Sequence, residues 1–213
     1  MSSFGGAPAG GGLLSFEDAD GFSGTWSQTV WAVCAYPLSG LQRVTAESVN
    51  SSAASKTASV TCPAGKRVVG AGFQHAAGVA PSFANALVLD DLRIGQSLTT
   101  VTATSREAQG GTPASWWLAV QAVCAYPPPG LEWVMAVSAL DSTSPKNASA
   151  TCPAGKRVLG AGGEITGGLG EVRFETIRPD VFFDHYRFVN AREDQDGTTA
   201  NWNLRAYAVC ATA

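Results

Sequence analysis

An eleven-residue sequence occurs twice in this chain of 213 residues, with a single change between its copies. The first copy, CPAGKRVVGAG, covers residues 62–72, and the second, CPAGKRVLGAG, covers residues 152–162. A second motif, AVCA, occurs three times, with its cysteines at positions 34, 124 and 210. The chain therefore contains one closing segment followed by two complete units, and its fold must be one that can be assembled from repeats.

Each unit has the pattern of a β module. The stretches KTASVTC and KNASATC alternate small or apolar residues with polar ones, which is the two-residue period of a half-buried strand. Turn residues separate these stretches, namely Pro-Ala-Gly after two of the cysteines and Asp-Gly or Gly-Gly before each AVCA strand. Helical periodicity is not evident in any stretch. We therefore predict an all-β protein of tandem small antiparallel β-sandwich or barrel modules.

The repeat also predicts a division of the chain into four segments. The first is a flexible Gly-rich leader, and the second is an N-terminal half-repeat with a connector. The third is a β module with its own connector, and the fourth is a second β module. The boundaries that we expect are residues 1–12, 13–61, 62–151 and 152–213.

The CPAGKRV motif is predicted to be scaffold and not a site of chemistry. A phosphate-binding loop needs two glycines before a Lys-Ser or Lys-Thr pair, whereas Lys66 and Lys156 follow one glycine and precede Arg-Val. A zinc site needs paired ligands, but the chain has no Cys-x-x-Cys, and His75 and His185 occupy non-equivalent positions. Those histidines also leave no repeated Ser-His-Asp or Cys-His arrangement. The Gly-Ala-Gly that ends the motif allows close backbone packing or a β-bulge. We predict no enzyme activity and no cofactor.

Charge and hydropathy exclude two classes of partner. The net charge is −3 and the isoelectric point is near 5.3, whereas a protein that binds a nucleic-acid backbone needs a basic face. Apolar runs stay shorter than the 18 residues that a membrane-spanning helix requires. We therefore expect no nucleic-acid partner and no membrane insertion.

The five cysteines occupy repeated positions, which predicts a disulfide framework and an extracellular or cell-surface location. Two pairings are possible. One joins Cys62 to Cys124 and Cys152 to Cys210 and leaves Cys34 unpaired. The other joins Cys34 to Cys62 and Cys124 to Cys152 and leaves Cys210 unpaired. We prefer the first pairing because it makes each module self-contained.

The sequence resembles a known repeat through CPAGKRVLGAGG, GEVRFETIRPD and EDQDGTTANWNLRAYAVCA. This repeat is found in uncharacterised secreted or surface proteins of Streptomyces and related actinobacteria. It combines a Cys-Pro-x-Gly turn with a terminal aromatic-Ala-Val/Ile-Cys-Ala strand, often in tandem. The resemblance covers nearly all of residues 13–213. It implies secreted or surface-associated β modules, and it carries no catalytic or ligand-binding residues.

Two acidic turns, EDADG and EDQDG, deserve comparison with calcium loops, in which alternating carboxylates hold Ca²⁺. The middle copy of this turn reads EAQGG and lacks both aspartates, so calcium explains two copies whereas a hairpin turn explains all three. We therefore predict no metal site. The residues that a calcium site would use are Glu17, Asp18, Asp20, Glu193, Asp194 and Asp196.

The six tryptophans fall into two groups. Trp26, Trp116 and Trp202 recur in register before each AVCA, and we predict that they anchor the core. The other three have no tryptophan at the equivalent positions, which is typical either of ordinary variation in packing or of side chains that contact a ligand or partner. The candidate ligand or interface aromatics are Trp31, Trp117 and Trp133.

These features predict a non-catalytic structural or interaction component of an extracellular or surface assembly, built from disulfide-stapled β repeats. The N-terminal half-repeat is expected to bind a protein partner or a second copy of the chain. It contains the closing strand of a unit, with an apolar face of Trp26, Val30 and Val33, but not the opening strands. The alternative is a carbohydrate-binding, lectin-like module with glycans as partners.

Overall fold

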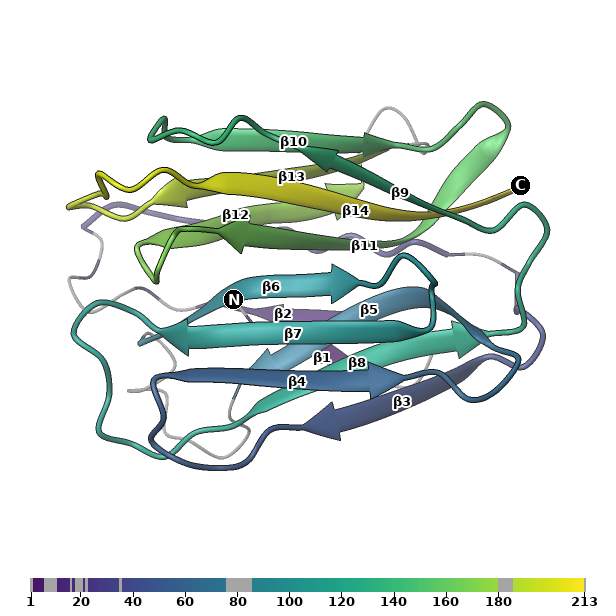
Figure 1. Ribbon diagram of the computed structural model, residues 1–213, viewed down its shortest axis with the longest axis horizontal. Coiled ribbons are helices and arrows are strands. Elements are labelled where there is room, and N and C mark those ends of the chain that lie inside the picture. Colours follow the sequence, from purple (N-terminus) through teal and green to yellow (C-terminus); the bar gives the residue numbers. More distant parts are fainter. Residues whose placement is uncertain are drawn as a thin grey trace.

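The computed structural model has an all-β architecture, as predicted, and its described residues form fourteen strands in open antiparallel sheets (Figure 1). Helices are absent from the part of the chain that the structure describes, so no described helix could cross a membrane. The described residues are 2–5, 11–15, 17, 21, 23–34, 36–75, 86–179 and 186–212.

The first module is a sandwich of two layers with three strands each. Its strands are antiparallel throughout, and the two layers share one apolar core. One layer has the order β3 (Gln42–Glu47), β8 (Leu118–Ala125) and β5 (Arg67–His75), and the other has β4 (Ser55–Thr61), β7 (Thr100–Glu107) and β6 (Leu87–Ile94).

The second module repeats this arrangement strand for strand. Its layers have the order β9 (Glu132–Val137), β14 (Asn203–Thr212) and β11 (Lys156–Thr166), and β10 (Lys146–Thr151), β13 (Tyr186–Glu193) and β12 (Val172–Pro179). The connector strands β9 and β10 pair with β14 and β13 of the module that follows them, whereas the expected boundary at residue 151 assigned them to the preceding module. The reason is that β14, the closing strand of the module, and β13 each have a second edge, which β9 and β10 fill.

β4 lies at the outer edge of its layer, and its residues alternate between the core and the solvent. Ala58 and Val60 face the core, whereas Thr57 and Ser59 face outward. On the outer face, the hydroxyl groups of Thr57 and Ser59 make hydrogen bonds to threonines of β7 at 3.1 and 2.8 Å. Cross-strand hydroxyl pairs of this kind stabilise an antiparallel sheet without requiring apolar surface.

Each module is anchored by a buried tryptophan, as predicted for two of the three repeated positions. Trp116 is 1% exposed and Trp202 is 0% exposed. The indole Nε1 of each donates a hydrogen bond to the glutamate nine residues earlier, at 3.1 Å in the first module and 2.8 Å in the second. A lysine ammonium lies 4.8 Å from the ring centroid in both modules, which adds a cation–π interaction.

The two modules share a six-stranded sheet, because β6 of the first pairs with β11 of the second. A β-bulge lies at the repeated glycine, between Val158 and Gly160 in β11. A Cβ atom at Gly160 would lie 2.6 Å from the carbonyl oxygen of Val69, and one at Gly162 would lie 2.1 Å from that of Leu92. The Gly-Ala-Gly of the repeat therefore provides both the bulge and the close backbone packing that the sequence predicts.

Substitution of Gly160 tests this junction. The Gly160→Ala variant is expected to lose about 2 kcal/mol of unfolding free energy, because its methyl group would overlap a main-chain carbonyl of the other module. The matched control is Gly70→Ala at the equivalent position of the first module, where a Cβ meets only the Val123 side chain at 3.4 Å. The control should stay within about 1 kcal/mol of wild type. Equal losses in chemical denaturation would contradict the proposed role of Gly160.

The N-terminal leader differs from the expected flexible segment. Ser2–Gly5 forms β1 and Gly11–Leu14 forms β2, and the two pair as an antiparallel ribbon. This pairing is possible in a Gly-rich sequence because it uses only main-chain groups. β1 lies beside β5 without pairing with it.

Candidate assembly surfaces

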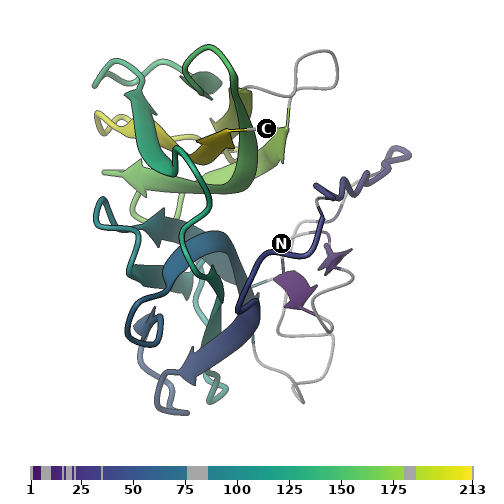
Figure 2. The same cartoon turned by 90° about the vertical axis from the view of Figure 1, so that its right-hand side faces the viewer.

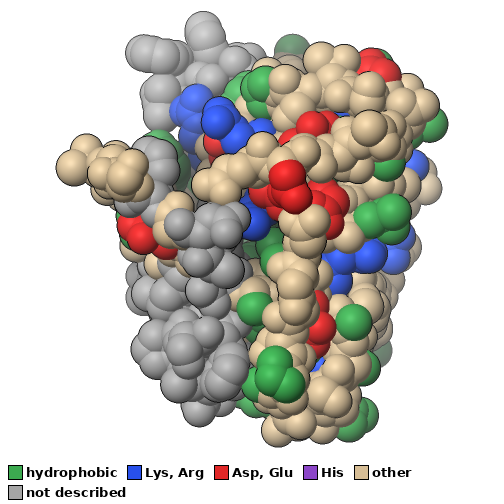
Figure 3. All heavy atoms as spheres, turned by 90° about the vertical axis from the view of Figure 1, so that its left-hand side faces the viewer, with side chains coloured by type: hydrophobic (Ala, Val, Ile, Leu, Met, Phe, Trp, Pro, Cys, Tyr) green, Lys and Arg blue, Asp and Glu red, His purple; other side chains and the backbone are tan. Residues whose placement is uncertain are grey.

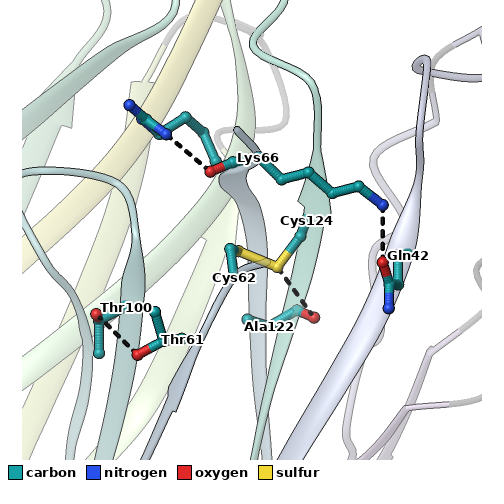
Figure 4. Close-up of a disulfide and its surroundings, with 8 residues drawn as sticks. Gln42, Thr61, Cys62, Lys66, Thr100, Ala122 and Cys124 are labelled. Carbon is teal, nitrogen blue, oxygen red and sulfur yellow. Dashed lines mark hydrogen bonds between the residues drawn. A yellow bond between two sulfur atoms is a disulfide. The ribbon is translucent and has the colours of Figure 1, made fainter. Parts of the chain in front are cut away.

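Two disulfides close the modules, and their pairing is the one that the sequence analysis preferred. Cys62 is bonded to Cys124 (Figure 4), and Cys152 is bonded to Cys210. The Cα–Cα distance is 5.7 Å in each case. Each bond joins the Cys-Pro-Ala-Gly turn, which precedes β5 or β11, to the closing strand of the same module, which is β8 or β14. Cys34 is unpaired and exposed. The equivalent position is thus bonded in both complete modules and free in the half-repeat.

The half-repeat, residues 13–35, keeps one local feature of a module. The Nε1 of Trp26 donates a hydrogen bond to Oε1 of Glu17 at 2.8 Å, which is the same bond that both buried tryptophans make. However, residues 23–34 form no strand, and Trp26 is 50% exposed. The prediction that Trp26 anchors a core is therefore wrong, because the described residues supply no opposing layer for it.

The half-repeat consequently exposes side chains that are buried elsewhere in the molecule. Val30 is 51% exposed and Val33 is 45% exposed. Figure 2 shows this dark-blue segment extending to one side of the two sandwiches. In the second module the equivalents of Trp26, Val30 and Val33 are Trp202, Ala206 and Val209, and all three are fully buried. The half-repeat thus exposes to solvent apolar side chains whose equivalents are buried in β14.

Two sheet edges lie on the same side of the molecule as the half-repeat. Among the described strands, β5 pairs only with β8, and β12 pairs only with β13. They are the repeat equivalents of β11 and β6, the two strands that form the junction. β1 lies beside β5, and the ring of Trp31 lies 5.7 Å from the guanidinium group of Arg178 in β12. The N-terminal segment therefore contacts both of these edge strands.

The three candidate aromatics occupy different environments. The Nε1 of Trp133 donates a hydrogen bond to the carbonyl oxygen of Ile94 at 2.8 Å, and its ring lies 5.7 Å from that of Tyr207. Trp133 therefore ties the second module to the first. Trp31 packs against Arg178, and Trp117 is half-buried next to the start of β8. Trp31 and Trp133 thus make specific contacts within this protein.

The glutamates and the aspartates of the acidic turns have different environments. Glu193 accepts hydrogen bonds from Nε1 of Trp202 at 2.8 Å and from the backbone N–H of Thr198 at 3.4 Å, so its carboxylate serves the hairpin. Glu17 makes the equivalent bond to Trp26. Asp18 and Asp20 lie outside the described residues.

Asp194 and Asp196 form a cluster with Glu171. The sequence analysis named the two aspartates but missed Glu171. One carboxylate oxygen of each lies within 4.8 Å of the others. Burial, followed by the neighbouring carboxylates, raises the pKa of Glu171 and of Asp194. Acidic side chains gather on this end of the molecule in Figure 3. The first module has Ala86, Ala108 and Gly110 at these positions, so a comparison of the copies could have revealed the cluster.

The module junction contains buried charge that the sequence analysis also missed. Asp91 of β6 lies opposite Glu164 of β11 in the pairing register. Glu164 accepts hydrogen bonds from Arg205, at 2.9 Å, and from the hydroxyl of Tyr207. Burial raises the pKa of Asp91 to about 7, and the negative charge of Glu164 adds to this effect. The two consecutive aspartates in the apolar strand LVLDDLRI were the available signal.

His75 belongs to the core of the first module. Its Nε2 lies 2.7 Å from the hydroxyl oxygen of Ser105, and its ring packs edge-on against Trp116 and Phe73. Burial lowers the pKa of His75 to about 3. The second module has Ile165 and Ala191 in place of the His75–Ser105 pair.

The chain matches no protein-family model and no curated protein sequence. Its function must therefore be inferred from these surfaces.

Proposed function

We propose that this protein is a non-catalytic structural component of an extracellular or surface assembly, and that its N-terminal half-repeat binds a protein partner. The observation that carries this proposal is the exposure of Trp26, Val30 and Val33, whose equivalents are fully buried in the second module. A face of this kind is stabilised when a partner covers it. Residues 23–34 belong to no strand, so they can join a sheet of the partner by strand addition.

The rest of the molecule supports a structural role. Two disulfides close the two modules, and the junction is held by main-chain pairing together with the Trp133–Ile94 hydrogen bond. Such a rigid pair of sandwiches can hold a binding segment in a fixed position. Disulfides persist in oxidising surroundings, which supports an extracellular or surface location. The contacts of Trp31, Trp117 and Trp133 give no specific support to the lectin-like alternative.

Deletion of residues 1–35 tests this function. The full-length protein is expected to form oligomers or to bind its partner, whereas the deletion variant should remain a monomer with two folded modules. The variant should fold because the first module begins at β3, after the deleted residues. Sedimentation velocity over a range of concentrations measures the association, and thermal unfolding measures the stability of the modules.

The Cys34→Ser variant serves as the control. It should associate like wild type if apolar contact drives binding, and more weakly if Cys34 forms a bond to the partner. A full-length protein that stays monomeric at high concentration and binds nothing through residues 17–34 would show that the proposal is wrong. A deletion that lowers the stability of the first module without changing association would do the same.

A further inference from the structure

We propose that the half-repeat is the closing strand of a third module, whose opening strands come from a segment outside residues 1–213 that is built from the same repeat. This inference rests on the proposed function, because it names the partner that the half-repeat binds. It follows from three features on one side of the molecule, namely the half-repeat itself, the two available sheet edges and the free cysteine.

The first feature is the place of a closing strand within a module. In both modules the closing strand lies in the middle of its layer, between a connector strand and the CPAGKRV strand. Residues 23–34 of the half-repeat, by contrast, belong to none of the described sheets. A partner that completes the module must therefore supply two strands for the same layer and an opposing layer for Trp26.

The second feature is the geometry of the internal junction. β6 and β11 pair across the two modules, and Gly163 lies opposite Leu92 in their register. β12 is the equivalent of β6, and β5 is the equivalent of β11, yet among the described strands neither pairs with a strand of another module. A third module could repeat the same contact twice, once with β12 and once with β5. Contacts that repeat head to tail in this way produce a closed ring when the rotation allows.

The third feature is the position of the N-terminal segment between these two edges. β1 lies beside β5, and Trp31 lies against Arg178 of β12. Figure 2 shows the two sandwiches one above the other, with the N-terminal strands and the dark-blue segment together at one side of them. The half-repeat therefore already lies where the third module would stand.

Cys34 specifies the chemistry of the missing segment. Its equivalents Cys124 and Cys210 are bonded to the cysteines of Cys-Pro-Ala-Gly turns, and both such turns of this chain are used. The partner should therefore carry a Cys-Pro-x-Gly turn with a free thiol. With oxidised glutathione as the oxidant, the Cys34 thiolate attacks the glutathione disulfide and releases one glutathione. The partner cysteine then displaces the second glutathione, so two thiols lose two protons and two electrons.

A fusion protein tests this inference directly. A second copy of residues 126–193, which contain β9 to β13 but not the closing strand, is appended after residue 213. The copy supplies five strands and a second Cys152. The fusion is oxidised with a glutathione buffer, its thiols are titrated under denaturing conditions, and its mass is measured by light scattering. A monomer with no titratable thiol and a bond between Cys34 and the copied Cys152 is expected.

A second measurement does not depend on the disulfide. In the fusion with Cys34→Ser, the amides of residues 23–34 are expected to become protected from hydrogen exchange by a factor of roughly 100 or more, because they join a sheet. A fusion that retains two thiols and leaves these amides unprotected would overturn the inference. So would a bond that forms only between fusion molecules.

The outcome also separates this inference from the proposed function. Closure of the third module in a fusion, with no association of the wild-type chain, would support the third module and refute the assembly role. Association that depends on residues 1–35, combined with a fusion that stays open, would support the assembly role and refute the third module.

Discussion

Removal of either disulfide is expected to lower the free energy of unfolding by roughly 4 kcal/mol, because each bond restricts the unfolded chain over a long loop. The bonded cysteines are separated by 62 residues in the first module and by 58 in the second, so the two losses should be nearly equal. The Cys62→Ser/Cys124→Ser and Cys152→Ser/Cys210→Ser variants, unfolded with guanidinium chloride, measure the losses separately.

Cys34→Ser is the matched control for both double variants. Its thiol is exposed and unpaired, so its replacement should leave the unfolding free energy within about 0.5 kcal/mol of wild type. Thiol titration of the air-oxidised, unfolded wild type should find one thiol. Five thiols in that titration, or double variants as stable as wild type, would contradict both the disulfide pairing and the extracellular location that it supports.

The strands were predictable because polar and apolar residues alternate along the local sequence. KTASVTC and KNASATC alternate in polarity, and they form β4 and β10. The repeat added what a single unit could not, because it showed that both units must have one fold. The module boundaries were harder to predict from the sequence. The connector strands β9 and β10 are assigned to the second module only by their long-range pairing with β14 and β13.

The exposure of Trp26 shows that an equivalent position in a repeat does not by itself predict burial. Its sequence context matches those of Trp116 and Trp202, and its hydrogen bond to Glu17 is preserved. Burial, however, depends on strands from elsewhere in the chain. Asp91 and Glu164 were missed for the same reason, since they meet only because one module lies against the other.

The junction should make the stability of the protein depend on pH in an unusual direction. Asp91 is buried, with Asp90 and Arg93 on its own strand and Glu164 and Arg205 on the strands of the second module. Its pKa is raised from 3.8 to about 7, so the native state retains a proton that the unfolded state has released. This stabilising contribution is complete below pH 4 and is lost as the pH rises through about 7. The loss is on the order of 4 kcal/mol.

His75 conceals this effect in the wild-type protein. Its native pKa of about 3 lies below the ordinary value of 6.5, so its contribution to stability is complete above pH 6.5 and is lost as the pH falls. Between pH 4 and pH 6.5 the two groups therefore have opposite slopes. A difference between two proteins that share His75 removes its contribution.

Asp91→Asn provides that difference, because an asparagine amide resembles the protonated acid and carries no charge to bury. The variant should match wild type near pH 4 and should exceed its unfolding free energy by on the order of 4 kcal/mol at pH 8, as measured by chemical denaturation. Asp141→Asn is the control of opposite sign. The hydrogen bond from Lys146 lowers the pKa of Asp141 to about 2, so this variant should lose stability relative to wild type above pH 4. Parallel pH profiles for wild type and Asp91→Asn would mean that the carboxylate of Asp91 is already charged at pH 5, with Arg93 and Arg205 offsetting its burial.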